Sequence, residues 1–157
     1  MDVREKTAYC GLYCADCIPG DRRIYDAIEK TLAVFDEVGM EQYAAFSARK
    51  SGVFGQYPQA VAVLREILKL KCSGSCRQGP VSALGCMSGC SIRVCVLEKG
   101  YGGCWECADH RSCAKLDRLK GFHPSLNETL DTIAAQGIDA WAEERGPHYP
   151  WNRKKDR

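Results

Sequence analysis

Residues 86–113, CMSGCSIRVCVLEKGYGGCWECADHRSC, contain six cysteines within 28 positions. A hydrophobic core does not need this density of thiols, because aliphatic and aromatic side chains fill a core by themselves. Thiolates are soft metal ligands, and two cysteines separated by two residues, as in Cys104-Trp-Glu-Cys107, can bind one ion from a single tight turn. We therefore interpret this stretch as a metal-binding segment whose ligands hold an irregular backbone in place.

The distribution of cysteines along the whole chain supports this interpretation. Of the 11 cysteines in 157 residues, three lie within residues 10–17 and eight within residues 72–113. Cysteines that serve as small apolar core residues would be scattered through the helices instead. The odd number and the lack of an apolar signal segment at the N-terminus favour reduced thiols over a disulfide framework. We expect a cytoplasmic protein.

Charge and hydropathy exclude several classes of partner. Lysine and arginine total 22 against 20 acidic residues, so no strong field is available to attract nucleic acid or acidic lipid. No window approaches the roughly 18 apolar residues that cross a bilayer. We expect neither a nucleic acid nor a membrane partner, which leaves an unknown protein partner as the remaining possibility.

Apolar residues recur at helical spacing through most of the remaining sequence. Asp21 can cap a helix that ends at Gly39, and Pro58 suits the first turn of another that runs to Lys71. Ser125-Leu-Asn-Glu128 has the pattern of a capping box. Further helices are expected over residues 41–50, 90–99, 113–120 and 126–137, with a short final helix that Asp139 caps and that carries Trp141. Since no segment alternates like a strand, we predict a mostly α-helical fold with an irregular cysteine-rich metal-binding region and little or no β-sheet.

The length fits one domain over residues 1–157, within which four parts differ in composition. Residues 7–17 are expected to run extended into a ligand loop, and the tail is expected to pack through Tyr149 and Trp151. The four parts are the cysteine segment 1–20, a helical insertion 21–71, the cysteine-rich metal-binding region 72–120, and the C-terminal helices and tail 121–157.

The order of the cysteine groups resembles a known family. The motifs that carry the resemblance are Cys10-Gly-Leu-Tyr-Cys14-Ala-Asp-Cys17, a C-x-G-x-C turn, Cys90-Ser-Ile-Arg-Val-Cys95 with Lys99-Gly100, Cys104-Trp-Glu-Cys107, and Cys113-x-x-Leu116. Together they resemble the domain-of-unknown-function family 3795, small bacterial and archaeal cytosolic proteins, over roughly residues 7–120. The resemblance implies a metal-binding protein, with zinc as the usual metal and no attached biochemical activity. The chain departs from the family in having three residues, rather than two, between Cys72 and Cys76 and between Cys86 and Cys90.

Cys95, Cys104, Cys107 and Cys113 form the first candidate metal site. These four sulfurs fall within 19 residues, so a local segment of chain can close a tetrahedral site around one ion. Trp105, inside the tight turn, is expected to shield the sulfurs from water. The nearby His110 is interpreted as a solvated loop residue rather than a ligand.

The remaining cysteines form a second group whose internal pairing the sequence leaves open. Cys14 and Cys17 are the best pair by spacing, and Cys76 and Cys90 are their expected partners. Cys72 is an alternative ligand in the same site as Cys76. The metal ligands of this group are therefore drawn from Cys10, Cys14, Cys17, Cys72, Cys76 and Cys90, while Cys86 is interpreted as a buried free thiol.

Catalytic motifs are missing from the sequence, which has no GxSxG, phosphate-binding loop or HExxH pattern. The spacing Cys10-x3-Cys14-x2-Cys17 also occurs in radical S-adenosylmethionine enzymes, but those need a large partial α/β barrel that a helical chain does not supply. Our first hypothesis is a non-catalytic protein with structural zinc that serves protein interaction or regulation. The alternative is an iron–sulfur protein with a redox or regulatory role, and a third hypothesis, zinc-assisted hydrolysis, requires an open ligand position.

Overall fold

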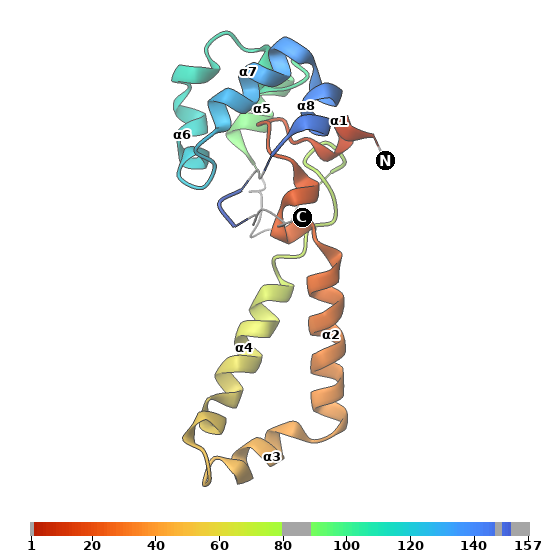
Figure 1. Cartoon of the computed structure of the whole chain (residues 1–157), viewed down its shortest axis with the longest axis vertical. Coiled ribbons are helices and arrows are strands. Elements are labelled where there is room, and N and C mark those ends of the chain that lie inside the picture. The colour runs from red at the N-terminus through yellow and green to blue at the C-terminus, as the bar shows by residue number, and fades with distance from the viewer. Residues whose placement is uncertain (1, 80–88, 147–148, 152–157) are drawn as a thin grey trace.

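The chain folds into a body and a long helical arm (Figure 1). The computed structural model describes residues 2–79, 89–146 and 149–151. The arm consists of α2 (Arg22–Glu37), α3 (Met40–Ser47), the 3-10 helix η3 (Gly52–Gln56) and α4 (Tyr57–Leu68). The helices α2 and α4 lie side by side, and α3 with η3 closes the end that is far from the body.

Short helices and turns build the body, into which both described ends of the chain fold (Figure 1). The α-helices of the body are α1 (Val3–Lys6), α5 (Ser91–Glu98), α6 (Ala114–Lys120), α7 (Leu126–Gln136) and α8 (Ile138–Glu144). Its 3-10 helices are η1 (Cys14–Asp16), η2 (Ile18–Gly20), η4 (Cys104–Glu106) and η5 (His110–Ser112). No strand occurs within residues 2–79, 89–146 and 149–151, where Thr7 and Tyr13 form an isolated antiparallel bridge. The prediction of a mostly α-helical fold is confirmed.

Local signals in the arm act as the sequence predicts. The Asp21 carboxylate accepts a hydrogen bond of 3.1 Å from the Arg23 backbone N–H and so caps α2. Gly39 has a φ of 66°, the left-handed conformation that lets the chain turn from α2 into α3. The rings of Phe35 and Tyr57 meet at 5.8 Å between centroids and join α2 to the start of α4.

The core of the body is centred on α7. Leu126, Leu130 and Ile133 of this helix are buried. The turn at Gly11 packs tightly against it, since a Cβ on Gly11 would lie 2.7 Å from Leu130 Cδ2, and its φ of 85° also favours glycine. This contact places the N-terminal thiol segment directly on the core.

An ion pair joins the last helix to the same N-terminal segment. The Arg145 guanidinium donates to both carboxylate oxygens of Asp16, at 2.8 and 3.0 Å, and lies 3.8 Å above the centre of the Tyr13 ring. Such a bidentate contact fixes orientation as well as distance. It therefore connects α8 to the turn that holds Cys14 and Cys17.

Three local predictions in the body were wrong. Residues 7–17 are not extended, because the chain turns at Gly11, whose N–H donates to the Ala8 carbonyl oxygen, and then continues into η1. The Ser125 side chain makes no capping hydrogen bond, since its backbone (φ −86°, ψ 18°) is not in the extended conformation typical of a cap. Asp139 lies inside the first turn of α8, because Gly137, with a φ of 87°, both ends α7 and precedes α8.

The expected packing of the tail is present. Tyr149 is buried, and the ring of Trp151 stacks on it at 4.9 Å between centroids. Among the helices of the described residues, none is both long enough and apolar enough to cross a membrane.

Candidate metal centre

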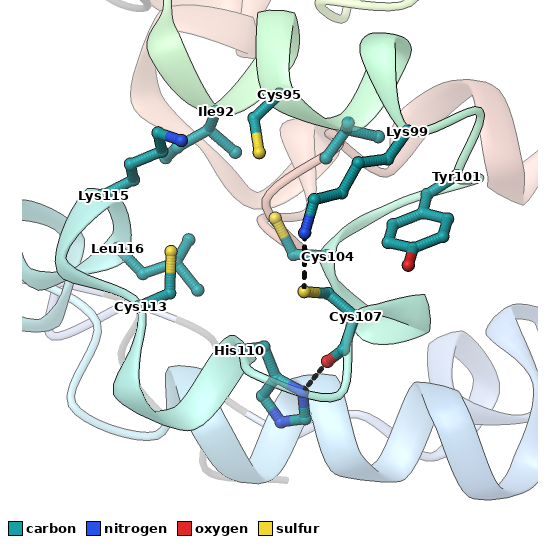
Figure 2. A pocket seen from close by; sticks show the side chains of 11 residues that line it. Ile92, Cys95, Lys99, Tyr101, Cys104, Cys107, His110, Cys113, Lys115 and Leu116 are labelled. Carbon is teal, nitrogen blue, oxygen red and sulfur yellow. Dashed lines mark hydrogen bonds between the residues drawn. The ribbon is translucent and has the colours of Figure 1, made fainter.

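Four thiols face one cavity of about 30 Å³ in the body (Figure 2). Cys95 comes from α5, Cys104 and Cys107 lie at the two ends of η4, and Cys113 precedes α6. Figure 2 shows their sulfur atoms directed toward a common space. The four cysteines that the sequence grouped by spacing thus line the same cavity.

The η4 turn is what brings Cys104 and Cys107 to this cavity. The Cys107 N–H donates to the Cys104 carbonyl oxygen at 3.1 Å, and the Cys104 N–H donates to the Tyr9 carbonyl oxygen at 2.8 Å. A Cβ on Gly103 would lie 2.2 Å from two atoms of the Trp105 ring, so a residue without a side chain is needed there. The half-buried Trp105 packs against both hydrophobic clusters of the body.

Cys104 is the thiol of this cavity whose ionisation its surroundings change most clearly. Burial first, and then the neighbouring Cys113, Cys107 and Cys95, raise the pKa of the Cys104 thiol from 9.0 to about 12. Burial removes water that would stabilise a thiolate, and nearby negative charges disfavour a further one. Without a cation in the cavity, Cys104 therefore stays protonated at neutral pH.

Two lysines also line the cavity, and their positive charges oppose the negative charge of an ionised thiol. Lys99 Nζ lies 3.7 Å from Cys107 Sγ and donates to it, as Figure 2 shows. The charges of Cys107 and then Cys95 raise the pKa of Lys99, which keeps its ammonium group protonated. The second cation is Lys115, at the start of α6. A divalent ion bound by four thiolates has a net charge of −2, which two ammonium groups balance.

His110 borders the cavity but directs its ring nitrogens to oxygen atoms. Nδ1 lies 2.8 Å from the Cys107 carbonyl oxygen, and Nε2 lies 2.8 Å from Oδ1 of Asp131, whose other carboxylate oxygen pairs with Arg111. Both ring nitrogens are therefore occupied by contacts with oxygen atoms. His110 is only 9% exposed, so its interpretation as a solvated residue was wrong.

The side chains that line the cavity are not arranged as the ligands of one metal ion. Within the described residues, no three histidine, cysteine, aspartate or glutamate side chains are arranged so that they could hold a metal ion together. The four sulfurs share a space from different walls, and each is carried by a side chain with a single rotatable bond before the sulfur.

A second group of thiols surrounds the buried hydroxyl of Tyr149. Burial, followed by the charges of Cys17, Cys14 and Cys10, raises the pKa of Tyr149. Burial also raises the pKa of Cys17, an effect that its hydrogen bond with Tyr149 opposes and the charge of Cys72 increases. The Tyr149 hydroxyl donates to the Tyr13 carbonyl oxygen at 3.3 Å. The tail thus lies directly on the N-terminal thiols.

Cys72 reaches this group from the end of the arm. Its N–H donates to the Pro19 carbonyl oxygen at 2.8 Å, beside the Cys14–Cys17 turn, and its thiol donates to the Gly74 carbonyl oxygen at 2.8 Å. The two ends of the arm, residues 21 and 71, are therefore held together next to cysteines.

Cys76 and Cys90 are the remaining described thiols. Burial raises the pKa of Cys76, whose sulfur accepts a hydrogen bond of 3.4 Å from the Tyr9 N–H, and the charge of Cys90 contributes to the same shift. Arg118 donates to the Cys90 sulfur at 3.3 Å. Cys86 lies outside the described residues. The charges of Cys72 and Cys90 thus act on Cys17 and Cys76 respectively, while the membership of these four cysteines in one ligand set stays a prediction.

Several residues around the thiols were not singled out from the sequence. Lys99 belongs to the Lys99-Gly100 motif, but nothing in the motif indicates that the ammonium group reaches Cys107. Lys115 and Asp131 have no local signal at all, because helix packing places them. Tyr149 was expected only to pack in the tail, and its position 136 residues beyond Tyr13 gave no sign of a contact with the N-terminal thiols.

Comparison with known proteins identifies one family, whose function is unknown. No curated protein and no solved structure matches the chain. A family model described as "Protein of unknown function (DUF3795)" matches residues 6–118. The matched interval contains every cysteine of the chain and ends before α7 and α8. It covers well over half of the sequence and confirms the resemblance seen in the cysteine motifs, so the chain belongs to the DUF3795 family of proteins of unknown function.

Proposed function

We propose that this protein is a thiolate zinc protein in which Cys95, Cys104, Cys107 and Cys113 bind one zinc ion. The observation that carries the proposal is the convergence of these four sulfurs, from three separate segments, on one cavity. The ion would join α5, η4 and α6 to one another.

The electrostatics of the cavity support a bound cation. Burial first, and then the neighbouring thiols, raise the pKa of Cys104, so this thiol is unfavourable to ionise alone; a divalent ion would favour the thiolate and displace the proton. Lys99 and Lys115 then balance the remaining negative charge. A cluster of neutral thiols that binds no metal has no negative charge for two lysines to balance.

Zinc is the metal we propose, because four thiolates complete its preferred tetrahedral coordination and a single ion needs no sulfide. An all-thiolate ligand set is compatible with both metals, so an iron–sulfur cluster with a redox or regulatory role is the alternative.

The proposed role of the ion is structural. Four protein ligands complete a tetrahedral zinc site and leave no position for a substrate or an activated water. We therefore infer a non-catalytic protein that presents its helical surface to another protein or acts in regulation. The second group of thiols, Cys10, Cys14, Cys17 and Cys72 around Tyr149 with Cys76 and Cys90 nearby, would supply a further thiolate site between the N-terminal segment and the end of the arm.

Zinc content of the purified chain tests the proposal. We expect colourless protein with bound zinc, and a variant with Cys95, Cys104, Cys107 and Cys113 all changed to serine should hold one zinc per chain fewer. Cys86→Ser is the matched control and should retain the full zinc content. Because the fourfold variant can lose its fold, the single variant Cys107→Ser is measured as well, by competition with a chelator. It should lower the zinc affinity of one site.

Two results would overturn the proposal. One is an unchanged zinc content and affinity in both the fourfold and the single variant. The other is brown protein that contains iron and sulfide in place of zinc, which would establish the iron–sulfur alternative.

A further inference from the structure

The far end of the arm exposes large apolar side chains. Tyr43 and Phe46 of α3 are 59% and 60% exposed, and Val38 and Val53, on either side of α3, are 64% and 74% exposed. Tyr43 and Phe46 are three residues apart on one helix, so their rings are neighbours on its surface. Side chains of this size and exposure, grouped at one end of a molecule, are typical of an interaction surface.

The arm buries little of its own surface. Within the described residues 21–71, the buried side chains are Tyr25, Ala44 and Ser47, and of these only Ala44 and Ser47 belong to α3. No residue of α4 is buried. A helical element of this length is stabilised mainly by packing of its apolar face, so a further surface is needed to cover the end of the arm.

Charge at the end of the arm is divided between two corners. Asp36, Glu37 and Glu41 lie where α2 meets α3, and Arg49 and Lys50 follow the end of α3. All five are exposed, and none has an ion-pair partner within the part of the chain that the structure describes.

Two carboxylates of the acidic corner destabilise the helix that carries them. Asp36 and Glu37 lie in the last turn of α2, which contains no basic residue, and the negative end of a helix dipole disfavours carboxylates there. An external cation beside them would relieve this repulsion. The end of the arm therefore has acidic residues at one end of α3 and basic residues at the other, and neither set has an ion-pair partner within the described residues.

We propose that the end of the arm, α3 with its flanking corners, is a dimer interface that binds a second copy of this chain. Two α3 helices pack antiparallel across a two-fold axis, so that the acidic corner of each copy meets Arg49 and Lys50 of the other. Tyr43 and Phe46 of both copies lie between the two charged contacts.

Two-fold symmetry explains why one surface has both charges. An isologous interface uses the same patch on both subunits, so the patch must be complementary to itself, with its two charges at opposite ends. Lys50 already lies 5.8 Å from the centre of the Phe46 ring, next to where the partner's acidic corner would approach. The arm extends this surface away from the body, which leaves the two bodies apart in the dimer (Figure 1).

The mass of the full metal-loaded chain, measured by sedimentation equilibrium over a range of concentrations, tests the interface. We expect a monomer–dimer equilibrium. The variant Arg49→Glu/Lys50→Glu, which leaves both corners acidic, and the variant Glu37→Lys/Glu41→Lys, which leaves both corners basic, should each weaken self-association by at least about tenfold. An equimolar mixture of the two variants should form a heterodimer, because every charged contact is then between opposite charges.

A matched control places the same charge change elsewhere on the arm. Lys30→Glu/Arg65→Glu alters the net charge as much as Arg49→Glu/Lys50→Glu, but in the middle of α2 and the last turn of α4, and should dimerise like the unaltered chain. Phe46→Ala should weaken the dimer without any change of charge. A chain that is monomeric at all concentrations, or a dimer that the tip variants leave unchanged, would overturn the proposal. So would a failure of the mixed variants to associate.

Discussion

The arm and the body of this protein are stabilised in different ways. The arm is built from neighbours in sequence, with a cap at Asp21, a turn at Gly39 and the packing of α2 on α4. The body depends on contacts between distant residues, such as the Arg77 guanidinium, which donates to the carbonyl oxygens of Thr7 and Gly102 at 2.6 Å each. All 11 cysteines lie outside the arm. The proposed metal would therefore act on the part of the chain that local signals specify least.

Removal of metal should therefore destabilise the body far more than the arm. This is the largest effect we expect. A structural zinc site contributes on the order of 10 kcal/mol to folding, comparable with the whole stability of a domain. Chelation should make the amides of α5, η4 and α6 exchange rapidly with solvent deuterium, while the amides of α2 and α4 retain much more of their protection. Equal loss of protection in arm and body, or no loss in either, would contradict this account.

Truncation of a core side chain should also affect the body far more than the arm. Leu130→Ala removes a fully buried side chain of α7 that contacts the Gly11 turn, and should lower the free energy of unfolding by about 2–5 kcal/mol. The same change at the half-buried Leu64 of α4 should cost about 1 kcal/mol or less. Urea unfolding followed by circular dichroism measures both, and equal costs would remove the distinction between arm and body.

Alkaline pH should destabilise the metal-free body. The pKa of Cys104 is about 12 in the folded chain against an ordinary value of 9.0, so the folded state keeps a proton that the unfolded state releases. The contribution of Cys104 is therefore fully present below pH 9 and is lost as the pH rises to 12, by up to about 4 kcal/mol. Unfolding of chelated protein at a series of pH values tests this, with Cys104→Ser as the control that should lack this component of the pH dependence.

A methyl group at position 103 should give the smallest of these effects. Gly103→Ala places a Cβ against the Trp105 ring, where three ring atoms lie within 2.5 Å, and the ring must move. We expect a loss of about 1–3 kcal/mol and weaker zinc retention, because the displaced turn holds Cys104 and Cys107. Gly55→Ala, in the arm, is the matched control, since a Cβ there meets no atom within 4 Å. Thermal unfolding with zinc present compares the two, and similar shifts would show that the turn is not specially constrained.

The sequence was sufficient for features that depend on local order. Helical spacing and capping residues predicted the arm helices to within a few residues, because each is determined by its own side chains. The four cysteines around the cavity could be grouped from their spacing, because 19 residues of chain connect them.

Features that depend on distant contacts could not be predicted in this way. The pair between Asp16 and Arg145 joins residues 129 positions apart, and nothing near either residue indicates the other. Lys115 reaches the cavity only because α6 packs beside α5. The failed caps at Ser125 and Asp139 have a similar cause, since the backbone around Ser125 and Gly137 determines which side chain can turn back onto the helix.

Zinc X-ray absorption spectroscopy of the purified chain tests the central claim most directly, because it reports the atoms bound to the metal. We predict a first shell of four sulfur atoms at about 2.3 Å with no nitrogen or oxygen. A shell that contains nitrogen or oxygen ligands, or a preparation with no bound zinc, would contradict the account.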